Sequence, residues 1–158
     1  PSSPVEDTTY ENMLAAWESG TIGSLNYMQA AFPYMKEQGE GRIINFASAT
    51  GMFGIAGQLA YGSNKEALRG LTKIAAKEWG QYGICVNVVL PGAESPAAKA
   101  WAEKFPEEYQ KQVMLNPMHR FGDPEDDIAP VVAFLAGPDS CYYSGQSVIV
   151  DGANSIMP

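Results

Sequence analysis

The sequence has few basic residues, few cysteines and no long apolar run. Only 10 of its 158 residues are Lys or Arg, against 18 Asp or Glu, and the formal net charge is -8. A protein that binds a nucleic-acid backbone needs a Lys or Arg for each phosphate it neutralises, and here the basic residues are scattered along the chain. We therefore expect no nucleic-acid partner.

No stretch reaches the roughly 18 consecutive apolar residues that a membrane span requires. The first residues are rich in Pro, Ser and acidic side chains and resemble neither a signal peptide nor a transit peptide. The two cysteines, Cys85 and Cys141, do not have the spacing of a zinc site or of a disulfide framework. The sequence thus predicts a soluble protein with no membrane partner and no metal, and the reducing cytoplasm is the default compartment.

Apolar residues recur at helical spacing in three long segments, residues 10–38, 61–79 and 124–135. Gly20 and Gly23 weaken the first of these helices in its middle, where it can bend. The third begins with Pro124 and a run of acidic residues, which suit the positive end of a helix dipole. Two shorter helices are expected within the otherwise irregular residues 93–122.

Three short apolar runs are predicted to be strands, at residues 42–47, 84–90 and 147–151. Their apolar residues are consecutive rather than alternating, which is typical of strands in a parallel sheet covered on both faces. Strands that alternate with helices indicate an α/β layer fold. Ligands of such folds bind where loops leave the carboxyl ends of the strands, so we expect the site in residues 48–61 and 91–122.

Tyr61 and Lys65 lie four residues apart at the start of the second helix, so their side chains share one face. An ammonium group close to a phenol stabilises the phenolate, and such a tyrosine can give or take a proton at a carbonyl or alcohol oxygen. Ser48 follows the first strand, and its hydroxyl could bond the same oxygen. By itself a Tyr–Lys pair is weak evidence, because an exposed tyrosine beside a solvated lysine is common.

The context of this pair is more specific. Residues 41–92 hold a strand that leads to Ser48, a glycine-rich loop, the motif Tyr61-Gly62-Ser63-Asn64-Lys65, an amphipathic helix, and a strand that ends at Pro91 and Gly92. Similar motifs continue through residues 120–129 and 144–152. In this order and spacing, the chain resembles the C-terminal part of a classical short-chain dehydrogenase/reductase along nearly its whole length.

The resemblance implies a Rossmann-like, doubly wound parallel sheet in three αβα layers. It also implies an NAD(P)-dependent oxidoreductase that interconverts an alcohol and a ketone or aldehyde. Tyr61 would be the general acid or base, Lys65 would hold the nicotinamide ribose, and Ser48 would orient the substrate oxygen. The residues implied to contact NAD or NADP are Tyr61, Lys65, Pro91, Gly92 and Ser95. The spacing of the Tyr–Lys pair argues against the enoyl-reductase branch, in which the two are further apart.

The family relationship also implies partners. Its members commonly form homodimers or homotetramers, and the substrate would be a small alcohol or carbonyl compound. Several large apolar residues lie in the two loops that border the expected site, and they favour a substrate with apolar bulk, although ordinary packing would explain each of them equally well. They are Met52, Phe53, Trp101, Phe105, Met114 and Met118.

Two features depart from the family pattern. Gly20 stands where the family usually has an asparagine of the proton relay, and a glycine there would leave room for an extra water. The glycine-rich turn that seats the cofactor pyrophosphate is also missing, since residues 51–57 have the wrong spacing and precede the tyrosine. The resemblance therefore implies that residues 1–158 are the C-terminal portion of a single Rossmann-fold oxidoreductase domain, preceded by roughly 90 further residues at about 30 per βαβ unit.

On this interpretation the 158 residues alone would be inactive. Gly20 and the missing phosphate-binding half keep an alternative open, in which the chain is a non-catalytic dimerisation or binding module with the reductase fold.

Overall fold

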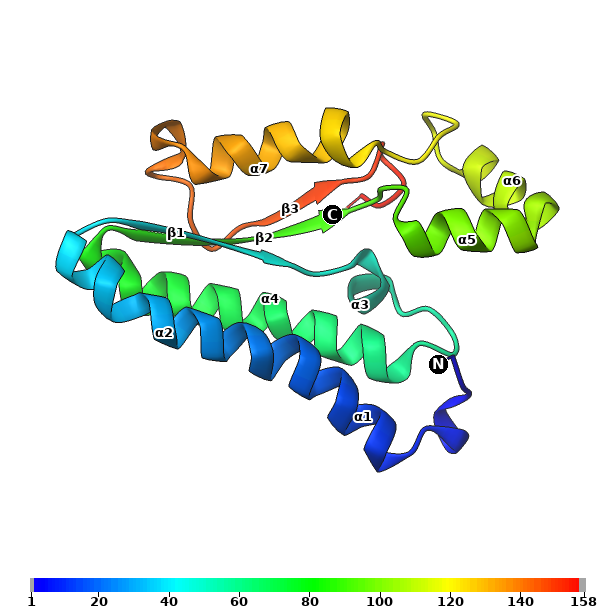
Figure 1. Ribbon diagram of the computed structural model, residues 1–158, viewed down its shortest axis with the longest axis horizontal. Coiled ribbons are helices and arrows are strands. Elements are labelled where there is room, and N and C mark those ends of the chain that lie inside the picture. Colours follow the sequence, from blue (N-terminus) through cyan, green and yellow to red (C-terminus); the bar gives the residue numbers. More distant parts are fainter. Residues whose placement is uncertain (1, 157–158) are drawn as a thin grey trace.

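The computed structural model describes residues 2–156 and arranges them in three layers around a parallel sheet (Figure 1). The strands are β1 (Gly41–Phe46), β2 (Ile84–Pro91) and β3 (Ser147–Val150), in the order β1-β2-β3. β1 pairs along most of β2, and β3 pairs only with the carboxyl end of β2. The expected αβα fold with a parallel sheet is confirmed, and the strand boundaries agree with the prediction to within about one residue.

One face of the sheet is covered by α2 (Gly23–Gln38) and α4 (Leu59–Trp79), and α1 (Tyr10–Trp17) packs against α4. The predicted long helix is confirmed as α1 and α2, joined without a break by a π turn at Glu18–Ile22. The core on this side is formed by buried residues of α2, α4 and β2, namely Met28, Ala75, Ile84 and Val86. Pro1, Met157 and Pro158 lie outside the described residues.

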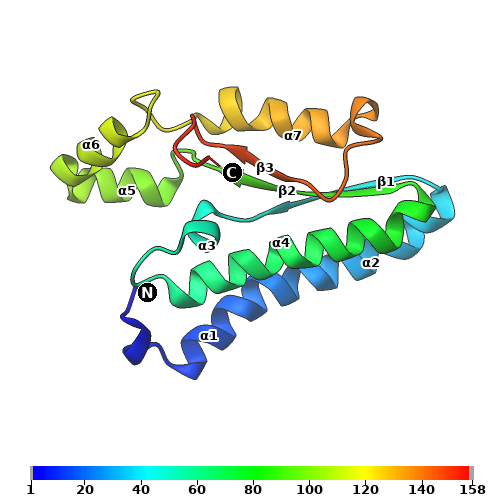
Figure 2. The ribbon, with the colours of Figure 1, turned by 180° about the vertical axis from the view of Figure 1, so that it is seen from behind.

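The opposite face is covered by α7 (Ala129–Ala136), which follows a π turn at Pro124–Ile128 (Figure 2). The chain steps from β1 to β2 and from β2 to β3 in the same direction across the sheet, but the first connection runs through α4 and the second through α7 on the other face. Two such connections have opposite hands. One of them therefore departs from the right-handed rule that about 98% of such connections follow.

The ends of the strands carry the remaining helices. The segment after Ser48 was expected to be a glycine-rich loop, and this was wrong for α3 (Ala49–Phe53), a short helix that Ser48 caps with its hydroxyl. Residues after β2 form a helical hairpin of α5 (Pro96–Lys104) and α6 (Pro106–Leu115), which lies beyond the carboxyl ends of the strands (Figure 1). Short 3-10 turns occupy Val5–Asp7, Gly80–Tyr82 and Pro138–Ser140.

The part of the chain that the structure describes has neither a membrane-spanning helix nor a cluster of metal-ligating side chains. In residues 2–156, every helix is too short or too polar to cross a membrane. Within the same range, no three or more His, Cys, Asp or Glu side chains are grouped as metal ligands would be.

Candidate functional site

A cavity of about 340 Å³ lies at the carboxyl ends of the strands. Its wall includes residues from both loops in which the site was expected, among them Ser48, Phe53, Leu90, Pro91, Gly92, Phe121 and Asp151. Three of the predicted site residues, Ser48, Pro91 and Gly92, are therefore brought together here. Tyr61, Lys65 and Ser95 lie outside this wall as the described residues define it.

Ser48 is held by the helix that it caps. Its backbone is extended, with φ -152° and ψ 144°, and its Oγ accepts a hydrogen bond of 3.2 Å from the Thr50 N–H. The Thr50 hydroxyl oxygen lies 3.1 Å from the same Oγ. Because a serine hydroxyl has one donor hydrogen and two acceptor lone pairs, Ser48 can still exchange a hydrogen bond with a ligand oxygen in the cavity.

Helix α3 fixes Ser48 next to the start of α4 through a glycine contact. A Cβ on Gly51 would lie 2.7 Å from the carbonyl oxygen of Gly62 and 2.9 Å from the backbone nitrogen of Glu66. Only a residue without a side chain allows the two backbones to approach so closely. The sequence showed a glycine-rich loop at this point, but it did not show that the loop packs against the helix that carries Tyr61.

Tyr61 and Lys65 do lie on one face of α4, as their spacing predicted. The Lys65 Nζ is 5.8 Å from the centre of the Tyr61 ring, and it donates a hydrogen bond of 2.8 Å to the carbonyl oxygen of Phe46. Partial burial lowers the pKa of the Lys65 ammonium from its usual value. The bond to Phe46 ties α4 to the last residue of β1, two residues before Ser48.

Gly92 is held between two backbones. Its N–H donates a 2.8 Å hydrogen bond to the Val150 carbonyl, and its own carbonyl accepts a 2.9 Å bond from the Gly122 N–H. Ser95 follows, and its hydroxyl caps α5 by accepting a hydrogen bond of 3.1 Å from the Ala98 N–H. The α5–α6 hairpin therefore begins and ends beside the wall of the cavity.

The six apolar residues expected around the substrate have different surroundings. Phe53 lies in the cavity wall, and Met118 lines a neighbouring cavity of about 370 Å³. Met52 packs against the core cluster between α4 and β2. The other three lie on the α5–α6 hairpin, so their role as substrate contacts stays a prediction.

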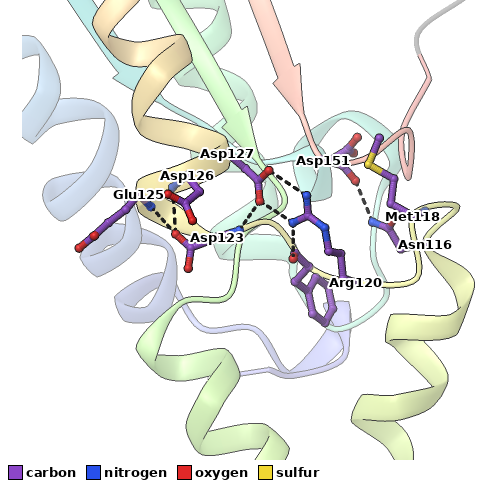
Figure 3. Close-up of polar contacts among 9 residues, drawn as sticks. Asn116, Met118, Arg120, Asp123, Glu125, Asp126, Asp127 and Asp151 are labelled. Atoms are coloured by element: carbon purple, nitrogen blue, oxygen red, sulfur yellow. Dashed lines mark hydrogen bonds and ion pairs between the residues drawn. The ribbon is translucent and has the colours of Figure 1, made fainter.

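Where the chain leaves the hairpin, Arg120 and two aspartates form a hydrogen-bonded network (Figure 3). From the sequence, the acidic residues here were expected only to favour the start of a helix. The Arg120 guanidinium bonds both carboxylate oxygens of Asp127, at 2.8 Å and 2.5 Å. The Asp127 Oδ2 also accepts the Asp123 N–H at 2.6 Å. Asp123 in turn caps the following turn by accepting two backbone N–H groups, of Glu125 at 2.7 Å and Asp126 at 3.0 Å.

Because of this network, we expect the base of the hairpin to lose stability as the pH falls. The Arg120 guanidinium and the Asp123 N–H hold the pKa of the Asp127 carboxyl well below its usual range. A carboxyl with a lowered pKa in the folded state contributes stability above its unfolded value, about 3.9, and that contribution is lost as the pH falls below it. We expect thermal unfolding temperatures between pH 5 and pH 2.5 to fall more steeply for the unchanged chain than for Asp127→Asn.

The effect should be small and weaker at high salt, because the pair is exposed. Glu125→Gln is the matched control, since it removes an exposed carboxyl of the same turn that bonds neither partner of the pair. Equal pH slopes in the unchanged chain and in Asp127→Asn would contradict the prediction.

A residue that the sequence did not single out fills the space at Gly20. A Cβ on Gly20 would lie 2.1 Å from the Nδ2 of Asn64, the residue before Lys65. The expectation that Gly20 leaves room for an extra water is therefore wrong, because the Asn64 carboxamide occupies that room. The sequence carried no sign of this contact, since the two residues belong to different helices far apart in the chain.

Comparison with known proteins gives consistent matches. A protein-family model described as Enoyl-(Acyl carrier protein) reductase matches residues 1–153. The 12alpha-hydroxysteroid dehydrogenase of a Clostridium species is 43% identical over 140 residues, which cover 89% of this chain and 54% of that protein. The (3R)-3-hydroxyacyl-CoA dehydrogenase of Rattus norvegicus is 40% identical over 149 residues, which cover 94% of this chain and 55% of that protein.

Solved structures agree with the fold. The TT0495 protein of Thermus thermophilus superposes with a TM-score of 0.89 at 35% identity, over 98% of this chain and 65% of that one. ElxO, solved with NADP bound, superposes with a TM-score of 0.89 at 28% identity, over 98% of this chain and 62% of that one. The chain spans about half the length of the curated relatives it matches.

Proposed function

Because the chain belongs to the short-chain dehydrogenase/reductase family, we propose that the protein carrying it is an NAD(P)-dependent oxidoreductase that interconverts an alcohol and a ketone or aldehyde. The observation that carries the proposal is the position of Lys65. Its Nζ lies 5.8 Å from the Tyr61 ring and bonds the end of β1 beside Ser48. A cation, a phenol and a serine hydroxyl, carried by the start of α4 and the end of β1, are the groups needed to move a proton at a carbonyl oxygen.

Each residue has a distinct role in the proposal. Tyr61 donates a proton to the substrate oxygen during carbonyl reduction and accepts it during alcohol oxidation. Ser48 orients the same oxygen with its hydroxyl. The ammonium of Lys65 has three N–H donors, and its bond to Phe46 uses one, so it can also bind the hydroxyls of the nicotinamide ribose.

The described residues fit the nicotinamide end of the cofactor. Pro91 and Gly92 form part of the cavity wall, where Gly92 presents no side chain, and the hydroxyl of Ser95 lies a few residues on. When bound, the cofactor supplies or accepts the hydride. The glycine-rich turn that would seat the pyrophosphate is not found among residues 2–156, so these residues do not decide between NAD and NADP; ElxO was solved with NADP.

The substrate in this proposal is a small alcohol or carbonyl compound with apolar bulk. Phe53, Leu90 and Phe121 give the cavity apolar walls next to Ser48. The relative described as a hydroxysteroid dehydrogenase acts, by its name, on a compound of this kind. The spacing of Tyr61 and Lys65 supports a carbonyl or alcohol substrate rather than an enoyl one.

A homodimer or homotetramer is also part of the proposal. Helix α7 is apolar nearly all round, yet Phe134 is 47% exposed and Tyr142 in the following turn is fully exposed. A helix without a polar face is usually covered on all sides. A second copy of the protein is the partner that family membership favours for this surface.

We propose that residues 1–158 are the C-terminal portion of a single Rossmann-fold domain and are inactive alone. The support is that the three described strands follow one another in sheet order, so they do not form the crevice at a reversal of strand order where dinucleotides bind.

The alternative is a non-catalytic dimerisation or binding module, which Gly20 in place of the family's asparagine favours. The two are separated by nicotinamide absorbance, followed with NADH and NADPH and a panel of ketones, and with the oxidised cofactors and a panel of alcohols. The oxidoreductase proposal expects a substrate-dependent change for at least one pair. No change across the panel, in protein shown to bind the cofactor, would favour the module.

A further inference from the structure

The contact between Gly20 and Asn64 joins the π turn to the helix that carries the proposed proton-transfer residues. Asn64 is only 4% exposed, and its carboxamide lies in the notch that Gly20 leaves open. The Nδ2 would be 2.1 Å, and the Oδ1 2.4 Å, from a Cβ at position 20. Any side chain at this position would displace the carboxamide.

The carboxamide is not free to move aside. Its Oδ1 accepts a 2.8 Å hydrogen bond from the Thr21 N–H and lies 2.7 Å from the Thr21 hydroxyl oxygen. The same hydroxyl lies 3.0 Å from the backbone carbonyl of Asn64. A displaced Asn64 would take the Asn64 Oδ1 away from the partly buried Thr21 N–H, and a polar group that loses its partner away from water is costly.

This contact also accounts for the local shape of the long helix. The π turn at Glu18–Ile22 includes Thr21, whose N–H bonds Asn64 of another helix. Helices change direction at π-bulges and where a side chain inserts into the hydrogen-bond ladder, and π-bulges are frequent at functional sites. The π turn between α1 and α2 is therefore the place where Asn64 bonds the long helix.

On α4, Asn64 lies between Tyr61 and Lys65 in sequence. Lys65 is bonded to Phe46 of the sheet, at 2.8 Å, while Asn64 is bonded to Thr21 of the neighbouring helix. Adjacent residues thus hold the first turns of α4 from two directions. Loss of the Asn64 bond would remove the link to the π turn, and the first turns of α4 would then be held only by the Lys65 bond and by packing against neighbouring helices.

We propose that Asn64 is a positioning residue. Its carboxamide, packed against Gly20 and bonded to Thr21, holds the first turns of α4 against the π turn and thereby sets where Tyr61 and Lys65 lie relative to Ser48. The functional part of this inference rests on the proposed oxidoreductase function. The structural part, a direct coupling between positions 20 and 64, can be tested without it.

The coupling is tested by thermal unfolding of Gly20→Ala, Asn64→Ala and the double variant, in the protein that carries this chain. Alanine is preferred over glycine inside a helix, so Gly20→Ala should raise the melting temperature once Asn64 is shortened. With Asn64 present, the same change should lower it by about 5 °C, because the carboxamide must move. This reversal of sign is the expected result, and equal shifts in both backgrounds would overturn the coupling.

Gly70→Ala is the matched control. Gly70 lies on the same helix as Asn64, and nothing lies within 4 Å of a Cβ at that position. Its effect on the melting temperature should be the same whether residue 64 is Asn or Ala. A sign change there as well would show that the reversal is not specific to Gly20.

The positioning role is tested by turnover of Asn64→Ala well below its melting temperature. We expect kcat to fall by about 10- to 100-fold, with KM and the cofactor Kd within a few fold, because misplaced catalytic groups affect the reaction more than binding. Added to Tyr61→Phe, Asn64→Ala should cause little further loss. A folded Asn64→Ala protein with unchanged kcat would overturn the role; an unchanged protein without turnover would instead overturn the proposed function and, with it, the positioning role.

Discussion

The Tyr61→Phe protein is expected to lose turnover by about 10²- to 10⁴-fold, the range that a positioned general acid contributes. The substitution removes one hydroxyl and keeps the ring over which Lys65 lies at 5.8 Å. Because Tyr61 is 44% exposed, the change should alter stability little. Cofactor binding should stay near normal, since Lys65 keeps its bond to Phe46.

The measurement is kcat for the best substrate found in the absorbance panel, with cofactor binding followed by fluorescence or calorimetry. Tyr27→Phe and Tyr34→Phe are suitable controls, because both tyrosines are on α2 and are 82% and 74% exposed. They should leave turnover unchanged. Turnover of Tyr61→Phe equal to that of the controls would remove Tyr61 from the proposed mechanism.

Gly92→Ala is expected to damage both the cavity and the fold. The added Cβ would lie 2.5 Å from the Cβ and 2.8 Å from the Cα of Asp151, so the end of β3 would have to shift. Gly92 cannot move away easily, because it is hydrogen-bonded to Val150 on one side and Gly122 on the other. Overpacking of this kind costs about 1–3 kcal/mol in the free energy of unfolding.

Because Ser48 and Gly92 share the cavity wall, we also expect kcat/KM to fall by about 10- to 100-fold, as for other small displacements of positioned groups. Gly70→Ala serves as the control again, since it adds the same methyl group in open space. Unfolding in denaturant and steady-state kinetics check the two parts separately. Stability of Gly92→Ala equal to that of Gly70→Ala would contradict the predicted clash.

Most helices and strands could be predicted because their periodicity and their end signals agree. The strand β2 is a continuous apolar run that ends at Pro91, and it is buried from Ile84 to Leu90. Helix α2 ends at Gly39, which has the left-handed φ of 75° that favours glycine. Helix α3 was missed because it is short and rich in small residues, and it depends on the Ser48 cap and on contact with α4.

The site was predictable only in part, because some of its contacts lie within one helix and others join separate elements. The spacing of Tyr61 and Lys65 within one helix sets their proximity, because a helix has a known repeat. Contacts between elements have no such repeat. The approach of Gly51 to α4, the pairing of Arg120 with Asp127, and the seat of Asn64 at Gly20 all depend on how separate elements pack.

The sequence alone therefore determined the alternation of strands and helices, the parallel sheet, and the pair of residues proposed to move a proton. These follow from local periodicity and from motifs within single elements. The tertiary structure decided that α7 covers the opposite face from α4, and that Asn64 rather than water fills the notch at Gly20. Both outcomes depend on burial and hydrogen bonding between segments far apart in the chain, and no local pattern encodes these.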